Sequence, residues 1–482
     1  MPLRTLMRER ARPARVRESP RAWWLAVATV CLGAFMGQLD ASIVTLTYVP
    51  LRSEFAASLA AVQWVSLSYL VTLAVLLVPV GRLADAHGHK LVYLHGFVVF
   101  TAASAACGLA PSLGALIGFR VVQGVGAAML QANSVALVVT SAPRDRMRTA
   151  LGVQAAAQAV GLALGPAIGG LLVSTVGWRW VFGINVPIGV VAVIAGVYLL
   201  PRTRSLTPIG RWDRSGLALL TAATTAGLLG VSAASGLGLP RWAPIALLTL
   251  AAACVAGFLL RENRAATPLL DLALIRSPAV GAGLLGALCG YLVLFGPLVL
   301  VPIVLAAARS SALHAGMILT ALPAGFALAA SVGERLLPHS FADRARATLG
   351  AVLGVAVLAA LVAAPLTAAW LVTLLGALGV ALGIFTPANN SLVMHAIPIH
   401  VAGTGGGLLN MTRSLGTALG VALVTLALHL RPAGAQLFDG PRSALLLLAV
   451  AAALMVLSAR LSATTPSPAR NMSGGPGTGV AT

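Results

Sequence analysis

Long apolar stretches dominate the pattern along the chain, from about residue 23 to about residue 459. They recur at close to the 20 residues that a helix needs to cross roughly 30 Å of hydrocarbon. Stretches of this length indicate helices rather than barrel strands. The sequence therefore predicts fourteen spans. They cover residues 23–48, 58–80, 91–110, 113–140, 149–175, 180–200, 215–234, 243–260, 278–306, 313–333, 347–364, 366–390, 402–428 and 442–459.

Composition agrees with this pattern. Of the 482 residues, 59% are hydrophobic and only 9% are charged, and the mean hydropathy is +0.94. A water-soluble globular protein has far more polar surface than this composition can supply. The fold class expected is an all-α integral membrane protein.

The net charge of +20 would suit a nucleic-acid partner, but the basic residues alternate with the spans instead of forming one patch. With fourteen spans, 24 of the 32 Lys and Arg residues fall on the side of the N-terminus. Cytoplasmic loops carry the excess of Lys and Arg. We therefore expect a multi-pass protein of the cytoplasmic membrane with both termini in the cytoplasm. The first apolar run is long and lacks a small-residue cleavage site, so it reads as an uncleaved span.

The stretch 161–170, GLALGPAIGG, is unusual inside a predicted helix. Glycine and proline disfavour helix interiors by roughly 1 and 3 kcal/mol each. In a bilayer, small residues let two helices touch closely, so the stretch indicates either ordinary close packing or a hinge and seal between moving halves. The order G-x-x-x-G-P-x-x-G-G resembles motif C, the antiporter signature of drug exporters of the major facilitator superfamily. The resemblance implies a hinge at Gly161, Gly165, Pro166, Gly169 and Gly170.

Asp40 is the only acidic residue well inside a predicted span. An ionisable group there costs about 2.5–3.5 kcal/mol, so it is a functional candidate, although a structural pair with an arginine is the alternative. Arg120 lies at a similar depth in the span 113–140, about seven residues or roughly 10 Å from its outer end. The run LIGFRVVQGVGAA around Arg120 and Gln123 resembles motif B of the same superfamily. That resemblance implies a role for the arginine in proton coupling.

The short loop GRLADAHGHK, residues 81–90, joins the second and third spans. It reads as a charged turn in which Asp85 caps or faces a neighbouring helix N-terminus and Lys90 meets lipid headgroups. Its order resembles motif A, a latch on the cytoplasmic side. Ala86 and His89 stand where that motif usually has arginines, and His89 is expected to be solvated. The resemblance implies a cytoplasmic gate at Gly81, Asp85, Gly88 and Lys90.

The run GWRWVFGINVPIG, residues 177–189, follows the fifth span. Trp178, Arg179 and Trp180 are predicted to anchor the chain at the membrane interface, where aromatic residues gather. The whole run resembles the junction typical of the fourteen-span drug:proton antiporter family.

An internal repeat sets the expected domain organisation. Residues 149–165 and 404–420 match at an offset of 255, including Gly161 with Gly416 and Gly165 with Gly420. Parallel repeats of this kind occur in transporters built from two six-helix halves. The predicted units are a basic tail (1–22), an N-terminal six-helix bundle (23–200), two inserted helices with basic linkers (201–277), a C-terminal six-helix bundle (278–460) and a disordered tail (461–482).

The second half carries one charge inside a span, Arg413. Asn410 precedes it by three residues, and Asn389 and Asn390 lie in the span before. These four side chains are cavity candidates. The alternative for the asparagines is hydrogen bonding between helices.

We expect a proton-coupled exporter of a small amphipathic compound, neutral or anionic because the spans hold one acid and two arginines. A drug, an antibiotic or another toxic metabolite follows from the resemblance, and a nutrient importer or facilitator is the alternative. An enzyme would need clustered acids, histidines or a nucleophile in the spans, and a lone Asp40 is too little, so an enzyme is not expected. The chain lacks a phosphate-binding GxxxxGK[ST] motif and a metal-ligand pattern, so no cofactor or metal is expected. The expected partners are the substrate, protons and the bilayer, with no nucleic acid, and the protein is expected to be a monomer.

Overall fold

The computed structural model describes residues 12–203, 213–265, 269–270, 272–336, 341–365, 367–398, 402–430 and 439–462. All regular secondary structure in these residues is helical. Fourteen helical segments of the described chain are long and apolar enough to cross a membrane. The all-α fold class and the number of spans are thereby confirmed. Residues 1–11 of the predicted basic tail, residues 463–482 of the predicted C-terminal tail and residues 204–212 of the first basic linker lie outside the described residues.

The elements fall into three sets along the chain. The first set is α1 (Ala14–Arg17), α2 (Ala22–Ile43), η2 (Val44–Thr47), α3 (Tyr48–Glu54), α4 (Leu59–Val62), α5 (Trp64–His87), α6 (His89–Gly108), α7 (Leu113–Ser141), η3 (Arg144–Arg146), α8 (Met147–Thr175), α9 (Arg179–Gly183) and α10 (Asn185–Leu199). The second set is α11 (Arg214–Ala234), α12 (Ala243–Glu262) and α13 (Leu272–Arg276). The third set is α14 (Pro278–Ala307), α15 (Ala312–Leu336), α16 (Asp343–Ala363), α17 (Ala368–Ala396), α18 (Ala402–His429) and α19 (Asp439–Leu461).

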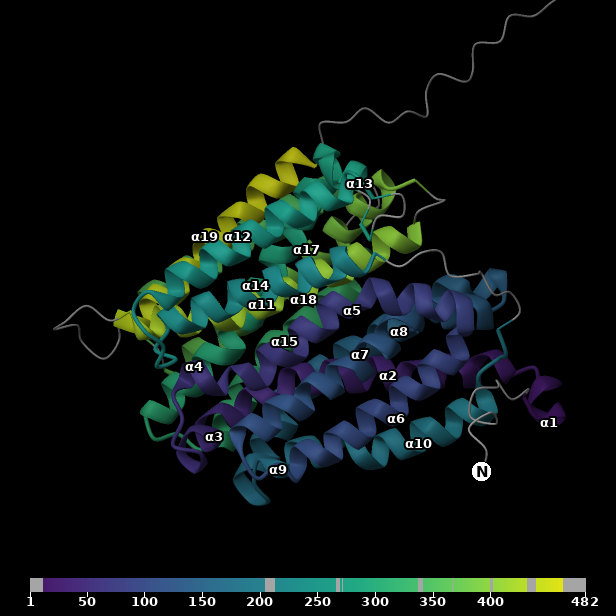
Figure 1. Cartoon of the computed structure of the whole chain (residues 1–482), viewed down its shortest axis with the longest axis horizontal. Helices are drawn as coiled ribbons and strands as arrows, with labels where there is room; N and C mark the ends of the chain where they lie inside the picture. Colours follow the sequence, from purple (N-terminus) through teal and green to yellow (C-terminus); the bar gives the residue numbers. More distant parts are fainter. Residues whose placement is uncertain are drawn as a thin grey trace, which may run out of the picture.

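The first and third sets form two sides of the molecule, purple to blue and teal to yellow in Figure 1. The short helices α3, α4 and α9 lie at one end of the long helices, and α1 and α13 lie at the other. We call these the α3 end and the α1 end. The positive-inside argument predicts that the α1 end is cytoplasmic.

The long helices pack in matching pairs. Within the two sides, α8 packs against α2 and α18 packs against α14. Across the boundary between the sides, α8 packs against α15 and α18 packs against α5. The predicted repeat pairs the fifth span with the thirteenth, which are α8 and α18, and these two helices make equivalent contacts.

The inserted pair, α11 and α12, packs together and lies against α5 and α18 through α11. The Nε2 of Gln63, at the end of α4, donates a hydrogen bond to Ser232 Oγ of α11 at 2.8 Å. Both groups are buried, so the bond fixes the pair beside one of the two boundary contacts.

The first span is longer than the sequence predicts. Instead of ending near residue 48, it turns into the 3-10 segment η2 and continues as α3 to Glu54. Within η2, the hydroxyls of Thr45 and Thr47 donate to the carbonyls of Ser42 and Val44 at 2.9 and 2.7 Å. A 3-10 segment inside a long helix is a common place for a hinge.

Large apolar side chains cover the outside of the bundle. Ile245 of α12 is 70% exposed, and Val190, Val191 and Ile194 of α10 are each at least half-exposed. Exposed apolar bands of this kind suit contact with lipid, so the chain is a multi-pass membrane protein.

Candidate functional site

Asp40 lies fully buried in α2 and accepts three side-chain hydrogen bonds. Its Oδ2 accepts from Arg120 Nη1 at 2.6 Å, and its Oδ1 accepts from Gln123 Nε2 at 2.9 Å and from Asn185 Nδ2 at 3.1 Å. The donors belong to α7 and α10. The structure therefore brings Asp40, Arg120 and Gln123 together, and the carboxylate joins three helices.

Arg120 is held on several sides. Its Nε donates to the carbonyl of Val65 at 2.8 Å, and its Nη1 donates to Gln123 Oε1 at 2.7 Å as well as to Asp40. The guanidinium carbon lies 4.1 Å from the centre of the Tyr69 ring. Buried charges are tolerated when they are paired and hydrogen-bonded. The site is thus a satisfied ion pair whose net charge is zero.

Two members of this network escaped the sequence analysis. Asn185 donates to Asp40, and Ser104 accepts a bond from Gln123 Nε2 at 2.7 Å. Asn185 stands in the run 177–189, which was interpreted only as an interfacial anchor. An amide at the start of an apolar span was the signal that could have found it, because polar groups within spans usually have partners.

Three of the motif C glycines face α2. A Cβ added to Gly161 would lie 2.5 Å from the carbonyl oxygen of Phe35, and one added to Gly169 would lie 2.8 Å from Ile43 Cγ1. A Cβ on Gly165 would overlap the Ser42 side chain. This face of α8 therefore contacts the stretch of α2 that carries Asp40 and leads into η2.

The remaining motif C residues face the other side of the molecule. A Cβ on Gly170 would lie 2.5 Å from the carbonyl oxygen of Ala312 in α15, and one on Gly316 would overlap the carbonyl oxygen of Pro166. Helix α8 continues through Pro166 without a break. The glycine stretch thus sits between α2 and α15, at one of the two boundary contacts.

The segment 81–90 agrees with its prediction at Asp85 and differs from it at Lys90 and His89. Lys90 does not meet headgroups: it is fully buried, and its Nζ donates to the carbonyls of Val197 and Leu200 at 3.0 and 2.8 Å. Asp85 of α5 contacts Nε2 of His89, the first residue of α6, at 3.3 Å, so it faces the N-terminus of a neighbouring helix as predicted. His89 is not simply solvated, because its Nδ1 also lies 2.8 Å from Asn133 Oδ1.

The two glycines of this segment have different surroundings. Gly88 adopts φ of 106° between α5 and α6, a conformation that side chains rarely allow. It therefore lets two long helices meet without a loop. Gly81 has open space where a Cβ would stand.

The two tryptophans after α8, Trp178 and Trp180, also have different surroundings. Trp178 is 4% exposed, and its Nε1 donates to Glu54 Oε2 at 2.5 Å. Arg179 Nη1 donates to Glu54 Oε1 at 2.7 Å. Trp180 is 57% exposed, as the interfacial anchor requires. The prediction of an anchor is therefore wrong for Trp178, which ties the run 177–189 to the end of α3.

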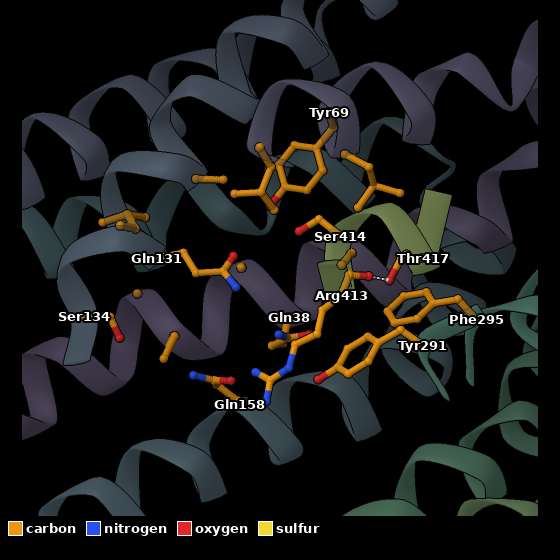
Figure 2. Close-up of a pocket in the computed structure, with 18 residues that line it drawn as sticks. Gln38, Tyr69, Gln131, Ser134, Gln158, Tyr291, Phe295, Arg413, Ser414 and Thr417 are labelled. Carbon is orange, nitrogen blue, oxygen red and sulfur yellow. Dashed lines mark hydrogen bonds between the residues drawn. The ribbon is translucent and has the colours of Figure 1, made fainter. Parts of the chain in front are cut away.

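A cavity lies between the two sides of the molecule, with about 720 Å³ of empty space including the part open to solvent. Its lining comes from α2, α5, α7, α8, α14 and α18. Figure 2 shows the polar side chains that line it. They are Gln38, Tyr69, Gln131, Ser134, Gln158, Tyr291, Arg413, Ser414 and Thr417.

Of the four cavity candidates in the second half, Arg413 lines this cavity and the three asparagines do not. Asn389 donates to the carbonyl of Gly283 at 2.9 Å, which joins α17 to α14. Asn410 accepts from Arg413 Nη1 at 3.1 Å. For Asn389 the alternative of bonding between helices is correct, because an amide buried among apolar helices needs a partner there.

Comparison with known proteins adds independent evidence. The family model of the Major Facilitator Superfamily matches residues 30–421. The chain is 32% identical over 408 residues to the tetracenomycin C resistance and export protein of Streptomyces glaucescens, covering 83% of this chain and 75% of that protein. It is 31% identical over 450 residues to a methylenomycin A resistance protein of Bacillus subtilis, covering 92% and 95%. It is also 30% identical over 404 residues to the riboflavin transporter RibZ of Clostridioides difficile, covering 83% and 87%.

Proposed function

Because the chain belongs to the major facilitator superfamily, and is therefore a transporter rather than an enzyme, we propose that it exports a small amphipathic compound in exchange for protons. The compound is a drug, an antibiotic or a toxic metabolite. In this proposal the six-helix bundles within 23–200 and 278–460 rock about the central cavity and open it to each side of the cytoplasmic membrane in turn. Both chain termini then lie in the cytoplasm.

The observation that carries the proposal is the buried pair of Asp40 and Arg120. Protonation of Asp40 would remove the negative partner of Arg120 while that cation stays buried, and an unpaired buried charge is costly. The three helices joined by Asp40 would then favour another arrangement. Proton binding and helix movement are thereby linked through one carboxylate, and Gln123 and Asn185 stabilise its charged form.

The glycine stretch supplies the second part of the mechanism. Gly161, Gly165 and Gly169 bring α8 against the part of α2 next to Asp40, while Pro166 and Gly170 bring it against α15. A change in α2 can therefore be passed to the boundary between the bundles. The close backbone contacts also limit leakage, which is the role of a hinge and seal.

The segment 81–90 completes the proposal as a latch at the α1 end. Gly88 provides the sharp junction, Lys90 fixes the start of α6 to the end of α10, and Asp85 and His89 hold each other across the junction. Gly81 lies one turn before Asp85 on α5, where its open surroundings leave room for a neighbouring helix to move.

An accumulation assay tests this function. Cells with and without the gene are compared for accumulation of a panel of fluorescent dyes, with a protonophore as control. We expect lower accumulation of the transported dyes, with the difference abolished by the protonophore and by Asp40→Asn. Proton-driven transport that persists in Asp40→Asn would disprove the coupling role of this carboxylate.

Import or facilitated diffusion of a nutrient is the second candidate, favoured by the similarity to a riboflavin transporter. Riboflavin itself is fluorescent and can be included in the panel. Import predicts higher accumulation in cells that carry the gene, whereas export predicts lower accumulation. Facilitated diffusion predicts a faster approach to equal concentrations and no effect of the protonophore.

A further inference from the structure

Among the described residues that line the cavity, Arg413 of α18 is the only one that carries a charge. These lining residues include no Asp, Glu, Lys or His. Among the described residues, Arg413 forms no ion pair with a carboxylate. The second intramembrane arginine, Arg120, is neutralised by Asp40, so the two arginines differ in their electrostatic surroundings.

The guanidinium of Arg413 also has unused hydrogen-bonding capacity. Its Nη1 donates to Asn410 Oδ1 at 3.1 Å, but its buried Nε has no acceptor among the described residues. In the view of Figure 2 the group points toward Gln158 and the Tyr291 ring. A planar guanidinium with free donors is well matched to a carboxylate or another oxyanion.

Aromatic side chains lie next to this charge. The guanidinium carbon of Arg413 is 5.5 Å from the centre of the Tyr291 ring. The Tyr291 and Phe295 rings are stacked, with centroids 6.4 Å apart and an angle of 15° between the planes. Both rings line the cavity, so they offer a surface on which a flat aromatic ligand can stack.

We propose that the cavity binds flat aromatic compounds that carry a negative charge, such as a carboxylate or an ionised phenol. The oxyanion pairs with Arg413, the ring system contacts Tyr291 and Phe295, and the amides of Gln38, Gln131 and Gln158 bind further polar groups. This inference rests on the proposed function only in taking the cavity as the transport site. It sets the charge of the substrate as negative, and it predicts that lipophilic cations bind poorly.

The test measures binding without a proton gradient, so it is independent of the direction and coupling of transport. Purified protein in phosphatidylcholine nanodiscs is titrated at pH 8 with fluorescein, which is anionic, and with rhodamine 123, which is cationic on a similar ring system. We expect fluorescein to bind at least tenfold more tightly. Arg413→Gln should abolish this preference, Arg413→Lys should keep part of it, and the exposed control Arg241→Gln should keep all of it.

A second variant keeps the inference testable even if Arg413→Gln misfolds. Gln158→Glu places a carboxylate in the same cavity and should weaken fluorescein binding while strengthening rhodamine 123 binding. The inference would be overturned if the unmodified protein bound rhodamine 123 as tightly as fluorescein or more tightly, or showed no saturable fluorescein binding. It would also be overturned if Arg413→Gln or Gln158→Glu left the preference for fluorescein unchanged. Dye export that depends on Asp40 would in that case leave the proposed function standing.

Discussion

Gly170 and Gly316 lie against each other where α8 crosses α15: a Cβ added to Gly316 would come within 3.1 Å of Gly170 Cα. A Cβ on Gly170 would in turn lie 2.5 Å from the carbonyl oxygen of Ala312. The two backbones are so close that not even one methyl group fits between them unless a helix shifts. The two sides of the molecule thus meet here through backbone atoms.

The first prediction concerns this contact. Gly170→Ala should force α8 away from α15, at a cost of about 1–3 kcal/mol for overpacking. We expect a lower unfolding temperature of the purified protein and a faster proton leak in proteoliposomes. Gly152→Ala is the matched control, because Gly152 lies on the same helix with no atom within 4 Å of an added Cβ. Equal behaviour of the two variants would contradict a sealing role.

The second prediction separates stability from coupling at the buried ion pair. Asp40→Asn leaves Arg120 as an uncompensated buried charge and should destabilise the protein by about 3–5 kcal/mol. The double variant Asp40→Asn with Arg120→Gln removes both charges and should recover most of that loss. Thermal unfolding measures the stability of both variants.

Transport assays distinguish the roles further. Proton-driven transport should be lost in both variants, although only the single variant is strongly destabilised. If the double variant regains transport together with stability, the pair is structural, which is the alternative that the sequence left open.

The sequence was informative where simple geometry decides the outcome. The rise per residue is fixed in a helix, so counting from the predicted ends of two spans brought Asp40 and Arg120 to one depth. They do lie 2.6 Å apart, although the first span continues to Glu54. The predicted span 113–140 is also within a residue of α7 at both ends.

The sequence was less informative where one residue type suits two different environments. A lysine or tryptophan near a span end suits the membrane interface, but it equally suits a buried hydrogen bond. Lys90 and Trp178 take the second option, and only the packing of α10 and α3 decides this. The partner of an amide such as Asn185 is likewise set by helix rotation, which hydropathy does not specify.

The third prediction tests the buried lysine. The ammonium of Lys90 binds the last carbonyls of α10, where the helix dipole favours a cation. Hydrogen bonds to charged groups contribute about 1.5–3 kcal/mol, so Lys90→Met should destabilise the protein by roughly that amount. Faster hydrogen exchange should be confined to the end of α10.

His95 provides the control on the same helix. Its side chain is exposed, and its Nδ1 lies 2.8 Å from the carbonyl oxygen of Leu91, one turn earlier on the same helix. His95→Ala should change stability by less than about 0.5 kcal/mol, as exposed positions usually do. Comparable losses in both variants would argue against a specific cap.

The fourth prediction uses two tryptophans separated by one residue. Trp178→Phe keeps one aromatic ring but removes the pyrrole ring with its Nε1 donor to Glu54, so the bond to a charged acceptor is lost and we expect a loss of at least about 1.5–3 kcal/mol. Trp180→Phe changes the same atoms on a side chain that is 57% exposed, and it should have little effect. Because Trp178 is buried and Trp180 is exposed, the difference between the two variants reports the lost indole bond together with the lost packing around Trp178. Thermal unfolding in one lipid mixture gives that difference, and a larger loss for Trp180→Phe would show that lipid contact, rather than the link to α3, is the main role of this run.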